Sequence, residues 1–224
     1  MKPDKDDIYS RNYPYINLEE QERIGKLKIA VFGAGLSSYA VEALARIGIK
    51  NISVYDHDYV ELSNLNRQNY YDEDVSNWKV AALRSRIDFA VIGSSIEKIT
   101  TDNYKDIIDD HDIVINTIDY DDSEIAFKVL EYCVKTNTDV YELVNLGWEG
   151  FSIPVNGYNL HRFKSMDTML NYLIPATEMG IEYYQDIKDI LDKENIEWLP
   201  QLVIGSMDCA RRVVFQIVAK EIIL

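Results

Sequence analysis

The chain of 224 residues carries 38 acidic against 23 basic side chains, a formal net charge of −15, with 47% hydrophobic and 27% charged residues. This composition is typical of a folded globular protein and excludes a disordered chain. The acidic excess argues against nucleic acid as the main partner, because phosphate contacts require clustered Lys and Arg. No apolar run approaches the roughly 20 residues of a membrane span, so we expect no membrane partner.

The two cysteines, Cys133 and Cys209, are too few for a disulfide framework or a four-thiolate zinc site. We therefore expect no zinc, and we expect both thiols to be buried as small hydrophobic groups. The first residues, MKPDKDDIYSRN, lack the apolar stretch of a signal peptide. These features predict a cytoplasmic protein, and the length predicts a single domain over residues 1–224.

The first two thirds of the chain alternate between short apolar runs and segments with helical spacing. Strands are predicted at 27–32, 52–55, 95–100, 112–117 and 140–144, and helices at 36–47, 78–89 and 123–134. Such an alternation favours an α/β, Rossmann-like fold, a mostly parallel sheet with helices on both faces. Residues 26–148 would form this nucleotide-binding core. They follow an N-terminal arm over 1–25, which includes a polar, helix-like stretch at 17–23.

The pattern changes after Trp148, where we expect antiparallel strands and a C-terminal helix to extend the sheet. A hairpin is predicted from 151–155 and 158–163 around the turn dipeptide Asn156–Gly157. Residues 156–200 lack a clear period over much of their length, and we interpret them as an excursion lying over the site. Apolar residues from Met207 to Val218 recur at helical spacing and predict the last helix.

The segment from Gly33 to Ser38, GAGLSS, joins the first strand to its helix, the context in which a glycine loop binds phosphate. Gly33 permits a tight turn, Gly35 lets backbone approach a phosphate, and the helix N-terminus favours the anion. Ser38 stands where the dinucleotide fingerprint has a third glycine. Many such junctions carry glycines without a ligand, so the loop alone does not decide between binding and structure.

Asp56 ends the second strand, 21 residues after Gly35, where a carboxylate accepts hydrogen bonds from a ribose. An NAD enzyme requires little more than this. The chain continues with a crowd of further polar and charged residues: Asp58, Asn64, Asn66, Arg67, Gln68 and Lys79. Arg67 and Lys79 follow the strand next to the predicted switch point of the sheet, where they suit a polyphosphate better than a nicotinamide.

Asp119 lies just past the apolar run DIVINT, at the carboxyl end of a predicted central strand. This edge faces the ligand crevice in open α/β sheets. Beside a triphosphate, an aspartate is a natural ligand for Mg²⁺, which takes one or two carboxylates together with phosphate oxygens. Capping of the next helix is the alternative role for Asp119, but Asp121 or Asp122 suits that role and leaves Asp119 free.

Several stretches resemble the ThiF/MoeB/HesA family and the related adenylation domains of ubiquitin-activating enzymes. They are YSRN, VFGAG, EALARIGI, DHDYVELSNLNRQ, the lysine at 79 and INTID, within residues 9–119. The resemblance implies an ATP-binding, mostly parallel sheet that forms a two-fold homodimer. It also implies an enzyme that adenylates the C-terminal glycine carboxylate of a ubiquitin-like or sulfur-carrier protein and releases pyrophosphate.

The same resemblance implies a role for each site residue. Asp56 would hold the ribose and Asp119 the Mg²⁺, whereas Asn64, Arg67 and Lys79 would hold the triphosphate. The expected nucleotide-binding set is Gly33, Gly35, Ser38, Asp56, Asp58, Asn64, Arg67, Gln68 and Lys79. The expected catalytic set is Arg11, Arg67, Lys79 and Asp119.

Arg11, in YSRN, matches an arginine that family members insert into the site of the neighbouring subunit. A planar cation supplied there would stabilise the charge that develops on the leaving pyrophosphate. The attacking carboxylate is already ionised at neutral pH, so the reaction needs no general base. Catalysis would consist mainly of positioning and charge neutralisation.

Departures from the family pattern keep other functions open. The paired CxxC zinc ligands are absent, and no cysteine falls within 156–200. Ser38 replaces a glycine, and Tyr120 replaces the Asn or Ser usual after the aspartate. The sequence thus predicts an adenylyltransferase without a catalytic cysteine of its own. The alternatives are a nucleotide-binding pseudoenzyme or partner-binding relative, adenylation of a tRNA-borne or small-molecule carboxylate, and an NAD(P) oxidoreductase, which leaves Arg67, Lys79 and Asp119 unexplained.

Overall fold

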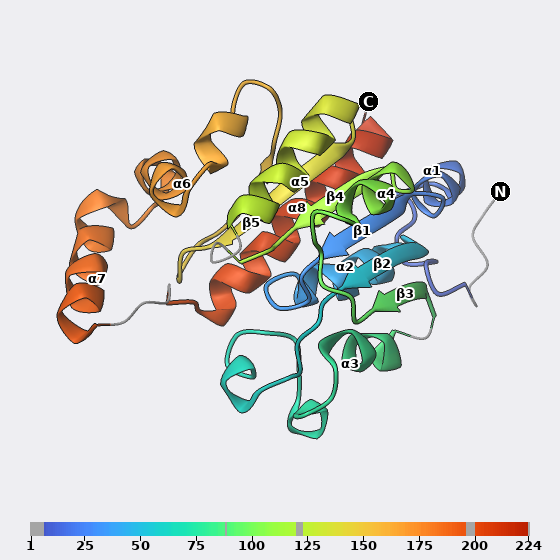
Figure 1. Ribbon diagram of the computed structural model, residues 1–224. Helices are drawn as coiled ribbons and strands as arrows, with labels where there is room; N and C mark the ends of the chain where they lie inside the picture. The colour runs from blue at the N-terminus through green and yellow to red at the C-terminus, as the bar shows by residue number, and fades with distance from the viewer. Residues whose placement is uncertain (1–6, 88, 120–122, 196–199, 224) are drawn as a thin grey trace.

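A computed structural model describes residues 7–87, 89–119, 123–195 and 200–223 (Figure 1). A six-stranded sheet forms its centre, in the order β3-β2-β1-β4-β5-β6. The first five strands run parallel, and β6 runs antiparallel to β5. The strands are β1 Lys28–Phe32, β2 Asn51–Tyr55, β3 Val91–Ser95, β4 Ile113–Asn116, β5 Asp139–Asn145 and β6 Gly150–Pro154.

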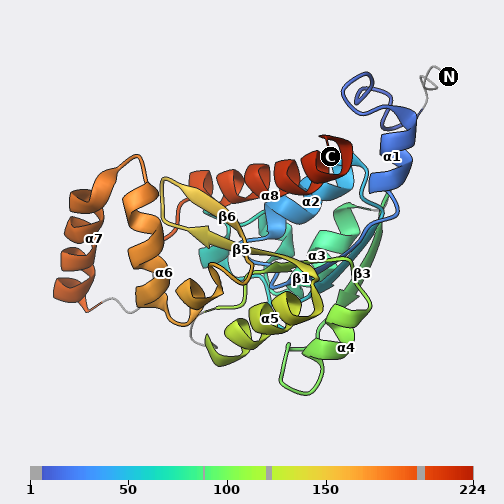
Figure 2. The ribbon, with the colours of Figure 1, turned by 90° about the horizontal axis from the view of Figure 1, so that it is seen from above.

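Helices pack on both faces of the sheet, which confirms the predicted fold class. Helices α2, α3 and α8 cover one face, and α4 and α5 cover the other (Figure 2). None of the helices within the described residues has the length and apolar content that a membrane span requires. The helices are α1 Leu18–Ile24, α2 Ser38–Ile47, α3 Lys79–Arg86, α4 Tyr104–Asp109, α5 Ser123–Thr136, α6 Met166–Leu173, α7 Gly180–Glu194 and α8 Val203–Ile223.

Strand β1 lies at the centre of the sheet because four consecutive side chains in it are apolar. Ile29 and Val31 are fully buried on the face of α2, α3 and α8, whereas Ala30 and Phe32 are fully buried on the opposite face. Burying a Val, Ile or Phe side chain contributes roughly 1.5–3 kcal/mol. A parallel strand covered on both faces needs such a continuous apolar run.

The chain changes direction in the sheet at β1. This strand pairs with β2 on one side and with β4 on the other. The helices that follow β1 and β4, which are α2 and α5, pack on opposite faces of the sheet. Such a switch point opens a crevice at the carboxyl edge of the strands. The fold therefore places a ligand crevice directly beside the glycine loop.

The N-terminal arm is fixed to the far end of helix α2. Gly48 ends this helix in a left-handed conformation (φ 117°), and a Cβ there would lie 1.9 Å from Gln21 Nε2, so a larger residue would clash. Gln21 and Asn12 both donate to Ile47 O, at 2.9 and 3.2 Å. The polar stretch predicted to be helical is α1, which begins with a capping box between Asn17 and its third helical residue.

The strand predicted at 95–100 is wrong in position. The edge strand β3 occupies Val91–Ser95 and pairs with β2 from Asn51 to Tyr55. Its sequence, VIGSS, has two apolar residues, and the predicted segment 95–100 also has two, Ile96 and Ile99, so apolar content does not distinguish the two segments. An edge strand is held chiefly by its backbone pairing, so hydrophobic patterning locates it poorly. After Ser95 the chain leaves the sheet.

The hairpin predicted around Asn156–Gly157 is wrong in its second strand. Its first strand is β6, but β6 pairs with β5, and residues 158–163 form a turn followed by the 3₁₀ helix η4 (Leu160–Phe163). Asn156 Oδ1 accepts from Tyr158 N at 2.9 Å, and Asn159 Oδ1 accepts from Asn156 N at 2.8 Å. These side-chain bonds close the chain into a turn instead of a strand.

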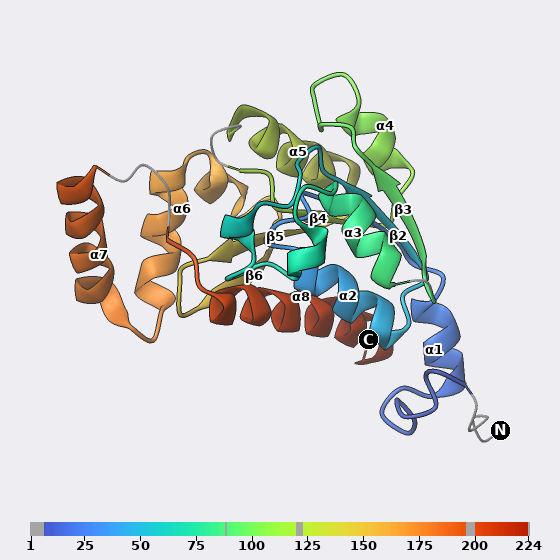
Figure 3. The same cartoon turned by 90° about the horizontal axis from the view of Figure 1, so that it is seen from below.

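Most of the described part of the 156–200 excursion is helical rather than irregular. Ser165 and Thr168 form a capping box that starts α6. Helix α6 packs on the core through Met169 and Leu173, whereas no residue of α7 is buried. Figure 3 shows α7 outside α6, at the opposite end of the molecule from α1. Local capping, which a search for long periods overlooks, explains the difference from the expected irregular segment.

Helix α8 extends beyond both predicted ends and covers the edge strand β6. The helix approaches β6 closely because Gly150 has no side chain. A Cβ at this position would lie 1.9 Å from Gly205 O and would clash. Gln216 Nε2 donates to Ser152 O at 3.0 Å, and Asp208 Oδ2 accepts from Gly150 N at 3.3 Å. Side chains of α8 thus satisfy backbone groups at the edge of the sheet, where an exposed strand would invite pairing with another chain.

Candidate active site

A large open cavity lies at the carboxyl edge of the sheet, with a volume of about 1330 Å³. It is lined by the loops after β1, β2, β3 and β4, by β5, and by helix α6. Most of the residues expected from the sequence line it: Gly33, Gly35, Asp56, Asp58, Asn64, Arg67, Gln68, Lys79 and Asp119. The structure therefore brings residues from three separate segments together, whereas Arg11 and Ser38 are not among the described residues of the lining.

The glycine loop is pressed against the end of β4. Gly33 has φ 90°, and a Cβ there would lie 2.5 Å from Thr117 Oγ1 and 2.9 Å from Thr117 O. Only glycine adopts this conformation without strain and leaves room for the threonine. Thr117 Oγ1 in turn donates to Phe32 O at 2.7 Å. This close approach places the loop and the segment that carries Asp119 on the same wall of the cavity.

Ser38 stands behind the glycine loop rather than in the cavity. Its side chain is fully buried, donates to Gly35 O at 2.7 Å, and accepts from Asn69 N at 2.9 Å. A glycine at this position would lack both bonds. The contacts of Ser38 therefore support a role in holding the glycine loop to the backbone at Asn69. Its role in nucleotide binding stays a prediction.

Asp56 links the glycine loop to the loop after β2. The residue is 8% exposed and accepts from Ala34 N at 2.6 Å and from Asp58 N at 2.7 Å. Tyr70 donates to Ala34 O at 2.6 Å from behind, and burial together with the nearby Asp56 charge raises the pKa of this phenol well above its usual value. Tyr70 thus remains a neutral donor, and the Asp56 carboxylate is held rigidly at the cavity wall.

Lys79 opens helix α3 and turns its ammonium toward the loop after β2. Its Nζ lies 2.9 Å from Asp58 Oδ2, and its side chain is only 9% exposed. Partial burial of the Asp58 carboxyl opposes ionisation, but the hydrogen bond and charge of Lys79 outweigh it and lower the pKa of Asp58. Asp58 is therefore an anion at neutral pH, and the pair is a buried cation joined to a half-exposed anion.

Arg67 and Asn64, which lie between Asp58 and Lys79 in the sequence, line the cavity and are held by hydrogen bonds. Arg67 Nη1 donates to Ser63 O at 2.6 Å, and its Nε donates to Gln201 Oε1 at 3.2 Å across the cavity rim. Asn64 is 6% exposed and accepts from Glu61 N at 3.0 Å. These bonds orient the Arg67 cation and the Asn64 amide.

Gln68 carries an unusual buried acceptor. Its side chain packs against Gly35, where a Cβ would lie 3.1 Å from Gln68 Nε2. Gln68 Oε1 is buried and has no hydrogen-bond partner within the described chain. Buried polar atoms nearly always have a partner, so an orphaned acceptor in a cavity wall indicates a ligand or water that donates to it.

Asp119 is exposed at the cavity, at the carboxyl end of β4 as expected. Tyr120, Asp121 and Asp122 lie outside the described residues. Within the described part, the group of His, Cys, Asp and Glu side chains close enough to share a metal ion is Asp56, His57 and Asp58, which does not include Asp119.

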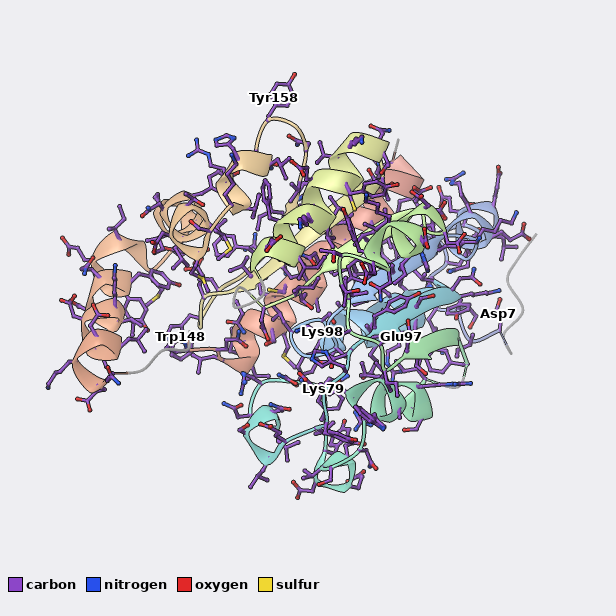
Figure 4. The ribbon with its side chains drawn as sticks, viewed as in Figure 1. Asp7, Lys79, Glu97, Lys98, Trp148 and Tyr158 are labelled. Carbon is purple, nitrogen blue, oxygen red and sulfur yellow. The ribbon has the colours of Figure 1, made fainter. Side chains whose placement is uncertain are left out.

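The cavity also has lining residues that sequence reasoning missed. Lys98 and Glu97 follow β3, and Figure 4 shows them near Lys79. The charge of Lys98 contributes to the lowered pKa of Asp58, which confirms that the two are close. A signal was present, because Lys98 follows a strand at the same carboxyl edge as Asp56 and Asp119, but the misplaced strand at 95–100 concealed it.

The far wall of the cavity comes from β5, from α6 and from Gln201, two residues before α8. Glu142 lies within the buried strand β5, is 1% exposed, and accepts from Asn116 Nδ2 at 2.6 Å. Met166 and Met169 of α6 and Gln201 complete this wall. A charged residue inside an apolar strand was the signal for Glu142. The excursion offered none for the methionines, since its helices were not predicted.

The turn between β5 and β6 anchors the excursion beside this wall. Trp148 Nε1 donates to Tyr183 OH at 3.0 Å, and Glu149 Oε1 accepts from Glu178 N at 2.8 Å. Tyr184 OH donates to Leu146 O at 2.9 Å. The start of α7 is therefore tied to the strand that lines the cavity.

Arg11 is exposed on the N-terminal arm, away from its own cavity. The neighbouring Asn12 is bonded to the end of α2, whereas the cavity lies at the start of that helix. A helix of 10 residues is about 15 Å long. Arg11 therefore belongs to the opposite end of the sheet from the site of its own chain.

The family model of the ThiF family matches residues 9–175, which is most of the chain. The protein belongs to the ThiF family. This match spans every described segment that lines the cavity up to α6, including the glycine loop and Asp119.

Similar curated proteins carry adenylyltransferase names. The chain is 31% identical over 158 residues to "Adenylyltransferase and sulfurtransferase MOCS3" of Arabidopsis thaliana, covering 67% of this chain and 34% of that protein. It is 32% identical over 122 residues to "Sulfur carrier protein ThiS adenylyltransferase" of Bacillus subtilis, covering 50% and 36%. The chain thus spans about a third of the length of these relatives.

Solved structures share the fold at low sequence identity. The E. coli tRNA N6-threonylcarbamoyladenosine dehydratase TcdA has a TM-score of 0.70 at 16% identity, with 96% of this chain and 94% of that chain covered. E. coli MccB with MccA-N7isoASN has a TM-score of 0.68 at 19% identity, with 98% and 66% covered. These likenesses establish the architecture over nearly the whole chain.

Proposed function

We propose that this protein is an ATP-dependent adenylyltransferase that activates the C-terminal carboxylate of a ubiquitin-like or sulfur-carrier protein ending in glycine. One observation carries the proposal: a single cavity combines a glycine loop, the ribose-type carboxylate of Asp56, the cations of Arg67 and Lys79, and the carboxylate of Asp119. The name of one relative supports the acceptor class, because the Bacillus subtilis protein is the adenylyltransferase of the sulfur carrier protein ThiS.

The site suits ATP better than NAD. A lysine ammonium that is only 9% exposed attracts a multiply charged phosphate chain strongly, because the surrounding protein screens it less than water does. Arg67 adds a second cation on the same wall. In NAD both phosphates are bridging and would lie at the glycine loop, and the nicotinamide end beyond them carries at most a single positive charge, so it gives these cations no partner.

The reaction requires positioning more than proton transfer. A carboxylate oxygen of the acceptor attacks the α-phosphorus, the bond from this phosphorus to the bridging oxygen breaks, and pyrophosphate leaves with the electron pair. The acceptor is ionised at neutral pH, so no base is needed. Arg67 and Lys79 would neutralise the charge on the leaving pyrophosphate, and the backbone at Gly33 would approach the phosphates.

Asp119 is the residue we propose as a ligand of Mg²⁺. Its exposed carboxylate at the cavity provides one hard oxygen ligand, and magnesium at phosphate sites needs only one or two carboxylates beside phosphate oxygens. When bound, the metal would supply further charge neutralisation on the phosphates. Gln68 Oε1, with its unsatisfied position in the wall, would accept a hydrogen bond from the nucleotide or from a water bound to it.

We further propose that the reaction on this chain stops at the acyl-adenylate, with no later thioester or persulfide formed on one of its cysteines. Cys133 and Cys209 are both fully buried, and burial raises the pKa of each thiol to about 12. The thiolate is the reactive form of cysteine, so neither residue supplies a nucleophile at neutral pH. Free thiols and a requirement for ATP both suit a cytoplasmic protein.

The active unit in this proposal is a two-fold homodimer. Arg11 lies at the opposite end of the sheet from its own cavity, so it acts only if it enters the cavity of a second subunit. An isologous interface would deliver two such arginines by symmetry. The exposed Tyr13 and Tyr15 on the same arm, 45% and 87% exposed, offer apolar surface for such a contact.

Calorimetry with MgATP and with NADH tests the nucleotide class. We expect binding of ATP that depends on magnesium, and no binding of NADH, because the cations of the cavity need a polyphosphate partner. Lys79→Met should remove most of the ATP affinity, whereas Lys188→Met, a change on the exposed helix α7, should leave it unaltered. Tight binding of NADH with no binding of ATP would contradict the proposal.

A further inference from the structure

The cation that is expected to hold phosphate is already paired with a carboxylate. Lys79 Nζ lies 2.9 Å from Asp58 Oδ2. The lysine side chain is 9% exposed and the aspartate side chain is 51% exposed. A polyphosphate that reaches Lys79 therefore meets an anion bonded to the same ammonium group.

The main chain of Asp58 is fixed relative to both neighbours. Its N–H donates to Asp56 Oδ1 at 2.7 Å, and its carbonyl accepts from Lys79 N at 3.0 Å. These two bonds leave the Asp58 carboxylate as the mobile group, which turns about the Cα–Cβ bond. Because 51% of the side chain is exposed, solvent lies beside the carboxylate and such a rotation would carry it toward water.

The basic side chains around Asp58 keep its carboxylate ionised, so that it competes with a phosphate for Lys79. His57 Nε2 lies 3.7 Å from Asp58 Oδ1, and Lys98 stands on the same cavity. The opposing effect of burial is outweighed by the hydrogen bond and charge of Lys79, with smaller contributions from His57 and Lys98, so the pKa of Asp58 is lowered. The carboxylate is ionised whenever ATP is fully charged.

We infer that Asp58 is a positioning residue that holds the Lys79 ammonium at the cavity wall. When a polyphosphate binds, Lys79 exchanges the Asp58 carboxylate for a phosphate oxygen. The inference rests on the proposed function and replaces the direct nucleotide contact expected for Asp58. Its consequence is that Asp58 weakens the binding of both ATP and pyrophosphate, and so speeds the release of pyrophosphate.

Calorimetry of Asp58→Asn tests the exchange with two probes, MgATP and inorganic pyrophosphate with magnesium. The asparagine keeps the shape and the backbone bonds but removes the charge that competes for Lys79. We expect about fivefold tighter binding of both probes. Glu97→Gln is the matched control, because Glu97 is an exposed acid on the same cavity, and its effect should stay below about twofold.

A double-mutant cycle assigns the gain to Lys79. Lys79→Met should weaken binding, and in that background Asp58→Asn should give no further gain. Weaker binding in Asp58→Asn would mean that the carboxylate contacts the ligand directly and would overturn the inference. So would a gain that persists without Lys79, or one that Glu97→Gln matches, because either would show a general charge effect.

Kinetics separate this inference from the proposed function. In ATP–pyrophosphate exchange, Asp58→Asn should lower the KM for pyrophosphate. It should also lower kcat, since the ATP formed in the assay leaves more slowly, while thermal melting confirms the fold. Exchange that is intact with unchanged KM and kcat would contradict the inference alone. Tighter polyphosphate binding without exchange on any acceptor would contradict the proposed function and leave the inference standing.

Discussion

At the scale of single residues, Asp56 connects structure and site. Its carboxylate accepts from Ala34 N in the glycine loop and from Asp58 N in the next loop. A residue expected only to hold a ribose also sets the distance between two loops that line the cavity. We therefore expect Asp56 variants to lose stability as well as ligand affinity, which makes them poor probes of binding.

Asp119 is the better probe, because it is exposed and removal of its side chain leaves no core cavity. Asp119→Ala should reduce ATP–pyrophosphate exchange by about a hundredfold or more, as for other groups that stabilise developing charge. Circular dichroism should show an unchanged fold, and Asp106→Ala, an exposed aspartate on α4, should keep full activity. Near-normal exchange in the Asp119 variant would reassign this residue to a structural role.

At the scale of elements, Asp208 is one of the α8 side chains that attach this helix to β6, beside Gln216. Asp208 accepts from Arg212 Nε at 2.8 Å, from Arg211 Nη2 at 2.9 Å and from Gly150 N at 3.3 Å. Partial burial alone would raise the pKa of Asp208, but these bonds outweigh it and lower the pKa. The anion therefore stabilises the folded state.

Asp208→Asn should lower the free energy of unfolding by about 2 kcal/mol at pH 7, the size typical of hydrogen bonds to charged groups. A lowered folded-state pKa gives stability that is present above the unfolded value near 3.9 and is lost as the pH falls below it. The difference between the two proteins should thus be constant from pH 5 to 7 and shrink below about pH 4. Urea unfolding across this range measures it, and a difference that grows on acidification would contradict the assignment.

The elements that sequence patterns predict well are those with strong burial on one or both faces. Strand β1 and helix α2 were located because Ile29 to Phe32 and the apolar stripe of α2 are fully buried. Strand β3 is predicted too far along the chain, because backbone pairing holds it at the sheet edge and the apolar residues Ile96 and Ile99 beyond it give a pattern equal to that of VIGSS. The second hairpin strand was wrong because Asn156 and Asn159 bond to nearby backbone and favour a turn.

The cavity residues that follow a predicted strand directly could be predicted from the sequence. Those that reach the cavity from a distant part of the chain could not. The stretch from Asp56 to Gln68 follows a strand directly, so its place at the sheet edge follows from topology. Met166, Met169 and Gln201 arrive through an excursion whose path depends on contacts such as Trp148 with Tyr183. No local pattern encodes such a long-range contact.

At the scale of the whole molecule, a chain with a net charge of −15 keeps a cluster of cations at one cavity. Six acids of the described residues line the same cavity: Asp56, Asp58, Glu61, Glu97, Asp119 and Glu142. In our proposal a polyphosphate would therefore bind there together with Mg²⁺, which offsets part of this negative charge. The N-terminal arm lies at the other end of the sheet, beside the end of α2. A complete site in our proposal therefore needs two copies of the chain.

Mixing two inactive variants tests this assembly. If Arg11 acts in trans, heterodimers of Arg11→Ala and Asp119→Ala contain one site with both residues intact. Exchange should then recover to about a quarter of the normal rate per subunit pair, as random pairing of symmetric dimers predicts. Arg23→Ala changes another arginine of the N-terminal segment and is the control. This variant should be active by itself, which would show that the loss of activity is specific to Arg11. A mixture that stays inactive although its subunits exchange, or a fully active monomer, would contradict the trans arrangement.

The most direct test of the central claim is ATP–pyrophosphate exchange that depends on an acceptor carboxylate. The acceptor is a small ubiquitin-like protein ending in Gly-Gly, compared with the same protein carrying a C-terminal amide, with tRNA and with free glycine. We predict magnesium-dependent exchange only with the protein that keeps its C-terminal carboxylate. We predict none with tRNA, with free glycine or with the amide, which cannot attack the α-phosphorus. Exchange that is absent with every carboxylate, or that proceeds equally with the amide, would contradict the proposed adenylyltransferase.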